Sequence, residues 1–534
     1  HIPSLIQPTN YRKLVKRTLE EYGMYINNVI PDYLIEKYVL LSHKDAILKA
    51  HFPKDNKELS LALRTLKFEE CLEYCLKNKI IRNQNKALVK NNEVEIDTDK
   101  INEFIKNLEY KLTKDQVQSI REIVTDMKNR SLMYRLLQGD VGTGKTLVAG
   151  IAMYANYLRK RQGVLMAPTD ALARQHFDNI SKLFKNYDIN VSLLVGSMST
   201  KEKNEVLEKI RNGEVDVIIG THAVFSASSE YFSLGLAIID EQHRFGVNQR
   251  NLLANKGEEV DLLLMSATPI PRTLSLSIYG DLDVSTLETF PNKRRDVKTL
   301  VLDYNSSRIE GMIDYCLSKE KQVFIVCPKI KSKGANNDSS VEEIVEKYSR
   351  KYAELISSLH GKMKNDEKVE ILRKFKEKEI KILVATSIIE LGIDIKSATG
   401  IIIYSANSFG LASLHQLRGR VGRDGESAYC ILVDHFEEGE DDSRLKFLET
   451  CSDGFRIAEE DMRLRGPGDF MGIEQSGFPS FNCLNIVSDF KMFEVARNEV
   501  QFMMNNLDDK DIAHYYDKIM TITNNLDMQM KLFD

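Results

Sequence analysis

The sequence predicts an α/β fold with two tandem nucleotide-binding-type domains, preceded by a helical region and followed by a mainly helical one. Three observations predict this fold. From about residue 101, short apolar runs that end in small or polar residues alternate with amphipathic stretches, as buried parallel strands and their helices do. The same alternation starts again after the linker-like segment 292–299. The chain has 534 residues, whereas a single core stops growing near ~250–300 residues.

Composition narrows the class of protein. Charged residues make up 28% of the chain, the formal net charge is -4, and the sequence has no run of eighteen apolar residues and no signal-peptide core. These features exclude a membrane or secreted protein and favour the cytoplasm. The seven cysteines are scattered without a paired CxxC, so we expect neither a disulfide framework nor a zinc site. The net charge neither supports nor excludes a nucleic-acid partner, because local basic grooves decide such binding.

The helical N-terminal region is interpreted as an accessory bundle without chemistry of its own. Its residues show helical spacing that is punctuated by Pro31 and Pro53. The polar stretch 84–100 is interpreted as a linker or an exposed excursion. The expected regions are 1–100 for the helical accessory and linker region, 101–290 for the first α/β domain, 291–435 for the second, and 436–534 for the C-terminal region.

Each α/β domain has its own set of predicted strands. In the first domain they are 132–137, 163–168, 215–220, 234–240 and 261–268, and in the second 321–328, 380–386, 400–406 and 427–433. After about residue 436 the helical spacing returns, with one Gly/Pro-rich break, RLRGPGDF, at 463–470.

A phosphate-binding loop follows the first predicted strand. Residues 139–146, GDVGTGKT, fit the pattern GxxxxGK[ST] between that strand and a helix. The backbone of such a loop wraps phosphates at a helix N-terminus, the lysine neutralises the β- and γ-phosphates, and the hydroxyl holds Mg²⁺. A chance Gly-rich turn is the alternative, and the flanking strand and helix argue against it. The predicted nucleotide-binding residues here are Gly139, Gly142, Thr143, Gly144, Lys145 and Thr146, and the predicted cofactors are ATP and Mg²⁺.

The acidic partner that a P-loop needs stands after the run 234–239. We assign Asp240 to the metal and Glu241 to the attacking water. A pair of acids after an apolar run could also be a helix N-cap, but its position one sheet-width after the P-loop favours the catalytic role.

Positive charge for the transition state is found in the second domain. The segment 416–423, QLRGRVGR, places Arg420 and Arg423 where they reach the γ-phosphate only when the two domains close. A simple phosphate-binding basic loop is the alternative reading of this segment. The predicted catalytic set is Lys145, Asp240, Glu241, Arg420 and Arg423.

The order of these segments resembles the superfamily 2 helicases. Segments that resemble the family's motifs surround the P-loop and recur in the second domain: Leu112–Thr113 with Gln116, Pro168–Thr169 with Gln175–His176, Gly220–His222, Ser266–Thr268, His360–Gly361 with Met363–Lys364, and Ala385–Thr386 with Glu390, Gly392 and Asp394. The resemblance implies two RecA-like domains, with Gln116 reading adenine and with Gly392 and Asp394 at the nucleotide.

More specific segments resemble the RecG family over essentially the whole chain. They are 240–250 (DEQHRFGVNQR), 265–274 (MSATPIPRTL), 279–283 (YGDLD), 414–423 (LHQLRGRVGR) and 453–472 (DGFRIAEEDMRLRGPGDFMG). The last resembles the helical-hairpin translocation motif that RecG shares with the transcription-repair coupling translocase. The resemblance implies that hydrolysis is coupled to movement through His243, Ser266, Thr268, Gln416 and Arg465. For Arg465 a structural salt bridge within the hairpin is the alternative.

Contacts with DNA are expected to be sequence-independent and made to the phosphate backbone. The chain has no Trp and no aromatic-rich stretch, which fits tracking of duplex better than stacking on single-stranded bases. Each candidate contact could equally be a helix cap or a surface charge. The candidates are Thr169, Arg174, Thr221, His222, Lys364 and Thr386.

Some positions depart from the family's pattern. Lys396 stands where the family usually has proline, 404–411 lacks an acidic residue and an arginine, 327–340 has lysines in place of acids, and Glu474 replaces a basic residue. RecG also carries an N-terminal OB-fold wedge, and this sequence begins about where that wedge would end. Fork-specific unwinding is therefore not expected from this stretch by itself.

The resemblance implies an ATP-dependent double-stranded-DNA translocase that remodels branched or forked DNA, by regressing stalled forks and migrating Holliday junctions. It also implies a monomer, a nucleoid-associated location, and single-stranded-DNA-binding protein as a candidate partner. Two alternatives stay open. One is a transcription-repair coupling translocase, against which the DEQH box and the YGDLD segment argue. The other is a nucleotide-gated DNA-binding protein with little turnover, which intact Lys145, Glu241, Arg420 and Arg423 disfavour.

Overall fold

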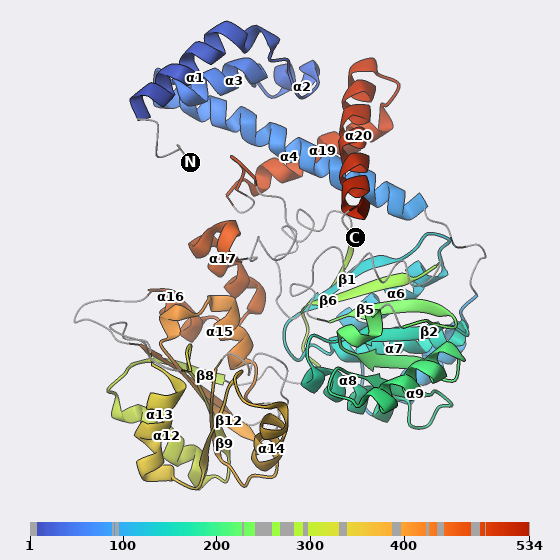
Figure 1. The fold of residues 1–534 in the computed structure, drawn as a ribbon, viewed down its shortest axis with the longest axis vertical. Coiled ribbons are helices and arrows are strands. Elements are labelled where there is room, and N and C mark those ends of the chain that lie inside the picture. The colour runs from blue at the N-terminus through green and yellow to red at the C-terminus, as the bar shows by residue number, and fades with distance from the viewer. Residues whose placement is uncertain are drawn as a thin grey trace.

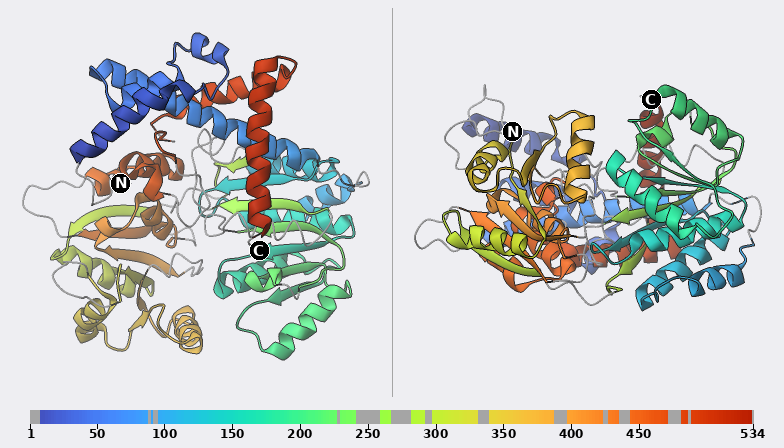
Figure 2. Two further views of the ribbon diagram at one scale, coloured as in Figure 1. Left: turned by 45° about the horizontal axis from the view of Figure 1, so that its top comes forward. Right: turned by 90° about the horizontal axis from the view of Figure 1, so that it is seen from below.

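A computed structural model gives the structure of residues 8–87, 90, 95–226, 229–240, 259–266, 282–291, 297–330, 339–386, 397–422, 427–434, 443–470, 481–485 and 488–532. Two α/β domains lie next to each other, and a helical unit lies at one end of the pair (Figure 1). The left view of Figure 2, turned so that the top comes forward, shows the same arrangement. Within the described residues, no helix combines the length and the apolar character that crossing a membrane requires.

The first domain is a parallel sheet with helices against it. Its strands follow the order β3-β4-β2-β5-β6-β1-β7. The inner strands are apolar at almost every position because helices cover both of their faces. The strands are β1 (Tyr134–Gly139), β2 (Gln162–Met166), β3 (Val191–Leu194), β4 (Val217–Gly220), β5 (Leu234–Ile239), β6 (Asp261–Ser266) and β7 (Asp283–Leu287).

The helices of this domain begin at recognisable N-terminal signals. Thr113 and Gln116 form a capping box at the start of α6, and Ser199 and Glu202 form one at the start of α9. Helix α7 starts directly after the P-loop and is buried along most of its length. The helices are α5 (Thr98–Lys106), α6 (Lys114–Lys128), α7 (Lys145–Leu158), α8 (Asp170–Leu183), α9 (Thr200–Arg211) and the 3₁₀ turn η2 (His222–Phe225).

The second domain repeats the plan of the first. Its parallel strands follow the order β10-β11-β9-β12-β13-β8, which matches strands β3-β4-β2-β5-β6-β1 position by position. The elements are β8 (Val297–Asp303), α12 (Ser307–Ser318), β9 (Gln322–Val326), α13 (Val341–Tyr352), β10 (Ile356–Leu359), α14 (Asn365–Lys376), β11 (Ile382–Ala385), β12 (Ala398–Tyr404), η5 (Ala406–Ser408), α15 (Leu411–Arg418) and β13 (Ala428–Asp434). The predicted fold of two tandem RecA-like domains is confirmed.

Helices from both ends of the chain form the helical unit. Buried side chains of α4, α19 and α20 belong to one apolar cluster, in which Leu72, Phe493 and Ile519 are almost fully buried. The unit comprises α1 (Pro8–Tyr22), η1 (Gly23–Tyr25), α2 (Asp32–Lys37), α3 (His43–His51), α4 (Asn56–Ala87), α19 (Phe490–Asn505) and α20 (Lys510–Leu532). The sequence assigned these segments to two separate regions, and the boundaries predicted there stay predictions.

Helices α16 (Ser443–Thr450) and α17 (Gly454–Phe470) connect the second domain to the helical unit. The Gly/Pro-rich stretch at 463–470, predicted as a break, belongs to α17 in the structure. A proline removes one backbone hydrogen bond and crowds the preceding turn, but a helix can pass through it with a bend.

Candidate nucleotide site and nucleic-acid face

The P-loop has the backbone that its glycines predict. Gly142 and Gly144 have φ angles of 91° and 88°, in the left-handed region. A Cβ on Gly144 would also meet Gln116 Nε2, so a side chain there would displace the Gln116 amide. The structure thus forms a narrow backbone cradle at the N-terminus of α7, which suits the phosphates of a nucleotide.

Gln116 reaches the P-loop from helix α6. Its Nε2 donates to the carbonyl oxygen of Thr143 at 2.8 Å, while its Oε1 accepts from the Thr113 N–H at 2.9 Å. The structure therefore brings Gln116 to the phosphate-binding loop, while its assignment to adenine stays a prediction.

Lys145 is turned back onto the loop in this conformation. Its ammonium donates to the carbonyl oxygens of Gly139 at 2.7 Å and Asp140 at 2.9 Å. To neutralise a β- or γ-phosphate, this ammonium must leave at least part of this arrangement.

Asp240 follows β5, and its carboxylate is held by a histidine that the sequence had quoted only as part of a motif. His176 on α8 is buried, and its Nε2 lies 2.8 Å from Asp240 Oδ2. A hydrogen bond of this kind fixes the orientation of a carboxylate that binds a metal, although the imidazole itself does not bind the metal. The Gln175–His176 pair was the available signal, but nothing local to it pointed to Asp240.

The residues present fit Mg²⁺. The described residues contain no group of three or more His, Cys, Asp or Glu side chains able to hold a metal. Mg²⁺ does not need such a group, because it keeps several waters and binds one or two protein oxygens together with phosphates. Half-buried Thr146, at the start of α7, and Asp240 would supply those oxygens. Ser266, a predicted coupling residue, ends strand β6 between β5 and β1.

The second domain meets the P-loop through helix α15. His415 Nε2 lies 2.8 and 2.9 Å from the two carboxylate oxygens of Asp140, and both side chains are buried. Arg420, two residues beyond α15, is also buried. Gln416 is buried with its Nε2 unpartnered among the described residues, so a donor is available next to this interface. The second domain therefore contacts the P-loop of the first domain at this candidate nucleotide site.

Burial raises the pKa of Asp140, but its interactions with His415, the hydrogen bond from the Val141 N–H at 2.6 Å and the charge of Lys145 outweigh this effect. The pKa is therefore lower than that of an ordinary aspartate, and the carboxylate is ionised at neutral pH.

Several predicted site residues lie outside the described part of the chain. These are Glu241, His243, Thr268, Gly392, Asp394 and Arg423, together with the departures at Lys396 and Glu474. Arg465 belongs to α17, but its side chain is also outside the described part. Their predicted roles stay predictions.

The predicted DNA contacts follow neighbouring strands in each sheet. Thr169 and Thr221 come after β2 and β4, and Lys364 and Thr386 come after β10 and β11. Because carboxyl ends of parallel strands meet at one edge, these residues gather on one edge of each domain. In the first domain this half of the edge is distinct from the half that carries the P-loop and Asp240.

Individual contacts of these residues differ. Thr169 caps α8 by accepting from the Leu172 N–H at 3.4 Å, and Thr221 is buried. Arg174 is exposed on α8 with Nη2 3.4 Å from Ser197 Oγ, and His222 and Lys364 are exposed. The positive charges of Arg174 and Lys364 suit phosphate contact, whereas Thr169 has at least one structural role.

A repeated loop at this edge was missed from the sequence. Residues 196–203 after β3 and 361–368 after β10 share the pattern G-x-M-x-x-x-E-K. In each loop the last ammonium donates to the carbonyl of the first glycine, at 2.7 Å for Lys203 and 3.0 Å for Lys368. A comparison of the two halves of the chain would have found the repeat, and it adds the loop containing Ser197 to the predicted DNA face.

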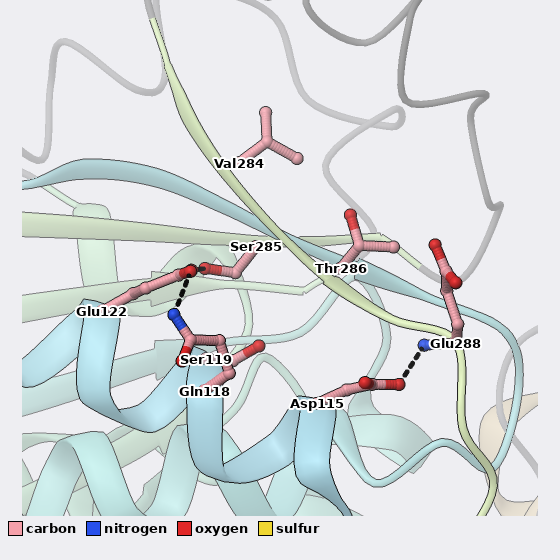
Figure 3. A pocket seen from close by; sticks show the side chains of 8 residues that line it. All are labelled: Asp115, Gln118, Ser119, Glu122, Val284, Ser285, Thr286 and Glu288. Atoms are coloured by element: carbon pink, nitrogen blue, oxygen red, sulfur yellow. Dashed lines mark hydrogen bonds between the residues drawn. The ribbon is translucent and has the colours of Figure 1, made fainter.

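A pocket on the far side of α6 does not suit phosphate. Figure 3 shows that carboxylates from α6 and from the segment that includes β7 line it. Asp115 accepts from the backbone N–H groups of Glu288 at 3.0 Å and Thr289 at 2.7 Å, and Glu122 bonds to Ser285. Hydrogen bonds to its carboxylate offset burial and lower the pKa of Asp115. The lining of the pocket is thus anionic, and its hydrogen bonds join α6 to the segment that includes β7.

Three parts of the chain match known protein families. Residues 113–276 match the DEAD/DEAH box helicase family, 307–425 match the helicase conserved C-terminal domain, and 451–526 match ATP-dependent DNA helicase RecG, domain 3, C-terminal.

Individual relatives agree. The chain is 40% identical over 497 residues to ATP-dependent DNA helicase RecG of Streptococcus pneumoniae, which covers 92% of this chain and 74% of that protein. It is 38% identical over 491 residues to the Bacillus subtilis protein of the same name, covering 91% of this chain and 72% of the relative. A solved structure of RecG bound to a three-way DNA junction superposes with a TM-score of 0.73 at 38% identity, covering 92% of this chain and 65% of that chain. The extent of this identity, together with the match to RecG domain 3, shows that the chain belongs to the RecG family of ATP-dependent DNA helicases.

Proposed function

We propose that this chain is an ATP-driven motor that moves along duplex DNA and remodels branched DNA, through fork regression and Holliday-junction branch migration. The observation that carries the proposal is the nucleotide site shared by two domains, since His415 of one domain contacts Asp140 in the P-loop of the other. A site of this kind links each change at the nucleotide to relative movement of the domains. The relative whose structure holds a three-way DNA junction supports branched DNA as the substrate.

The edge of the sheets that carries Thr169, Arg174 and the loop 196–203 in one domain, and Lys364 in the other, is the proposed path of the DNA backbone. Movement of one domain relative to the other would move these two sets of contacts along the duplex. Helix α17 packs on α15, so we assign it to the transmission of that movement toward the DNA.

A transcription-repair coupling translocase shares this kind of motor and is the nearest rival. The match of 451–526 to RecG domain 3 favours the RecG function. Mg²⁺ as the metal, a monomeric state, single-stranded-DNA-binding protein as a partner and a nucleoid-associated cytoplasmic location belong to the same proposal. Sedimentation with and without a fork substrate tests the monomer.

The proposal is tested by steady-state ATP hydrolysis of this chain with no DNA, single-stranded DNA, linear duplex or a three-way junction. We expect duplex and junction to stimulate hydrolysis and Lys145→Ala to reduce it about 100-fold or more, because the substitution removes the charge that stabilises the transferred phosphate. The exposed Lys319→Ala serves as a lysine control away from the P-loop. Hydrolysis that no DNA affects would contradict the motor, and DNA-dependent binding without turnover would favour a nucleotide-gated binding protein.

A further inference from the structure

A chain of hydrogen bonds runs from the P-loop into the second domain. Arg418 Nη2 lies 2.8 Å from Nδ1 of His415, whose Nε2 faces Asp140. A guanidinium can only donate, so Nδ1 must accept and the imidazole proton sits on Nε2. Nε2 therefore donates to the Asp140 carboxylate, and the contact with Arg418 fixes this orientation of the ring.

The same arginine reaches the start of the translocation region. Arg418 Nη1 donates to the carbonyl oxygens of Leu448 at 2.9 Å and Cys451 at 3.0 Å, at the end of α16 and just before α17. Asp461 on α17 accepts from the Leu411 and Ala412 N–H groups at the other end of α15, at 2.7 and 3.2 Å. Helix α15 is thus tied to the P-loop near its end and to α17 at its start.

Asp140 is also tied to the lysine that must bind phosphate. Its backbone carbonyl accepts from Lys145 Nζ at 2.9 Å and from Thr143 Oγ1 at 2.9 Å, while its carboxylate accepts from His415. When Lys145 moves to a phosphate, Asp140 loses one of its backbone partners. Asp140 therefore contacts Lys145 through its backbone carbonyl and the second domain through its side chain. A movement of Lys145 toward a nucleotide changes the surroundings of this one residue.

The C-terminal end of α15 packs closely against the P-loop. Gly419 has a φ of −67°, which any residue adopts, so its backbone does not require glycine. A Cβ at this position would lie 3.3 Å from Val141 Cβ and 3.3 Å from the Gln416 carbonyl oxygen. The close approach of the P-loop accounts for glycine at 419, and the contact is a built interface.

We propose that Asp140, His415 and Arg418 form a nucleotide-state latch. The latch holds the second domain against the P-loop while Lys145 faces the loop, and it weakens when Lys145 turns to the phosphates, which frees α15 to move with α16 and α17. His415 is a positioning residue in this scheme, since it acts through Asp140. The role of the latch in passing the nucleotide state to α16 and α17 rests on the proposed motor function.

The latch and the nucleotide compete, because the latch belongs to the conformation in which Lys145 faces the loop. Removal of the latch therefore raises nucleotide affinity, and by linkage it also reduces the effect of nucleotide on DNA affinity. We expect His415→Ala to bind ADP and a non-hydrolysable ATP analogue about threefold to tenfold more tightly, the change that corresponds to the net contribution of one typical hydrogen bond.

The experiment measures equilibrium binding of a fluorescent ADP and of the analogue to the full chain without DNA. The variants are His415→Ala, His415→Gln, Asp140→Asn and the double variant His415→Ala/Asp140→Asn. Glutamine keeps an N–H directed at Asp140, so it should restore much of the wild-type affinity. The double variant should bind no more tightly than the tighter single variant, because both changes remove one bond.

A second measurement compares affinity for a three-way junction with and without the analogue, and the ratio should move toward one in His415→Ala. His43 provides a matched control, because its Nδ1 lies 2.7 Å from buried Glu69 in the helical unit. His43→Ala should change stability but not nucleotide affinity. Wild-type or weaker nucleotide binding by folded His415→Ala, or additive effects of the two single changes, would overturn the latch. Because nucleotide binding is measured without DNA, the binding result still tests the latch if the chain proves not to be a DNA motor.

Discussion

The carboxylates of Asp240 and Asp140 each contact a histidine from a distant part of the chain. Both carboxylates belong to the candidate nucleotide site. His176 fixes one carboxylate from α8, and His415 fixes the other from the second domain. A buried carboxylate needs such donors because leaving it without a partner is costly. At the residue scale, the candidate nucleotide site therefore depends on the orientation of these two carboxylates. His176 and His415 fix that orientation, and neither belongs to the predicted nucleotide-binding residues.

Replacing His176 with alanine should weaken metal use. Without the imidazole, Asp240 loses the contact that holds its Oδ2, so we expect the Mg²⁺ concentration for half-maximal ATP hydrolysis to rise about tenfold or more. Titration of Mg²⁺ at saturating ATP measures it, with exposed His514→Ala on α20 as the control. An unchanged Mg²⁺ requirement would limit His176 to a packing role.

The lowered pKa of Asp140 predicts a pH dependence of stability. A carboxyl whose pKa is depressed by folding stabilises the protein fully above its unfolded pKa of ~3.9, and the contribution is lost as the pH falls through the folded value. We expect Asp140→Asn to lower the free energy of unfolding by about 1–3 kcal/mol at neutral pH. The difference from wild type should shrink as the pH falls below about 4. Denaturant unfolding between pH 3 and 7, on the order of one unit per step, tests this, and a difference that is constant with pH would contradict it.

At the scale of elements, the buried strands were predicted and the edge strands were not. The predicted runs correspond to β1, β2, β4, β5, β6, β9, β11, β12 and β13. The strands without a prediction are β3, β7, β8 and β10, which are the edges of the two sheets. Their residues are largely half-buried, so they lack the continuous apolar run that marks a strand covered on both faces.

Helix α15 depends on a residue of another element for its start. Asp461 of α17 is buried and accepts from two N–H groups that the first turn of α15 leaves free. Asp461→Ala should therefore cost about 1–3 kcal/mol and lower DNA-stimulated hydrolysis more than hydrolysis without DNA. Thermal unfolding together with both rates checks this. Exposed Glu459, on the same helix and outside that contact, provides Glu459→Ala as a comparison, and an equal loss of both rates in Asp461→Ala would argue against a coupling role.

At the scale of the whole molecule, helices near the two ends of the chain hold each other. Glu499 of α19 is buried and accepts from Lys37 Nζ and Tyr38 Oη, each at 2.6 Å. Burial, with the charge and hydrogen bond of Glu499, raises the pKa of Tyr38 to about 12, so its hydroxyl remains a donor at neutral pH. The N-terminal helices thus bind the C-terminal ones through polar as well as apolar contacts.

Glu499→Ala should loosen the helical unit without removing nucleotide binding. We expect a loss of about 1–3 kcal/mol, reduced from that of a fully buried pair because Lys37 is half exposed. Limited proteolysis should then cut the helical unit earlier, while ADP affinity stays at its wild-type value. Glu494, exposed on the same helix, gives Glu494→Ala as the matched control, and equal proteolysis of the two variants would contradict the prediction.

The sequence by itself determined the two α/β domains, the P-loop with Lys145, and the acid that follows β5, because each depends on a local pattern of apolar runs and glycines. Only the tertiary structure decided that His176 orients Asp240, that His415 reaches Asp140, and that the two ends of the chain form one helical unit. Those contacts join residues tens to hundreds of positions apart. No local periodicity encodes them, because the packing of sheets and helices alone brings such residues together.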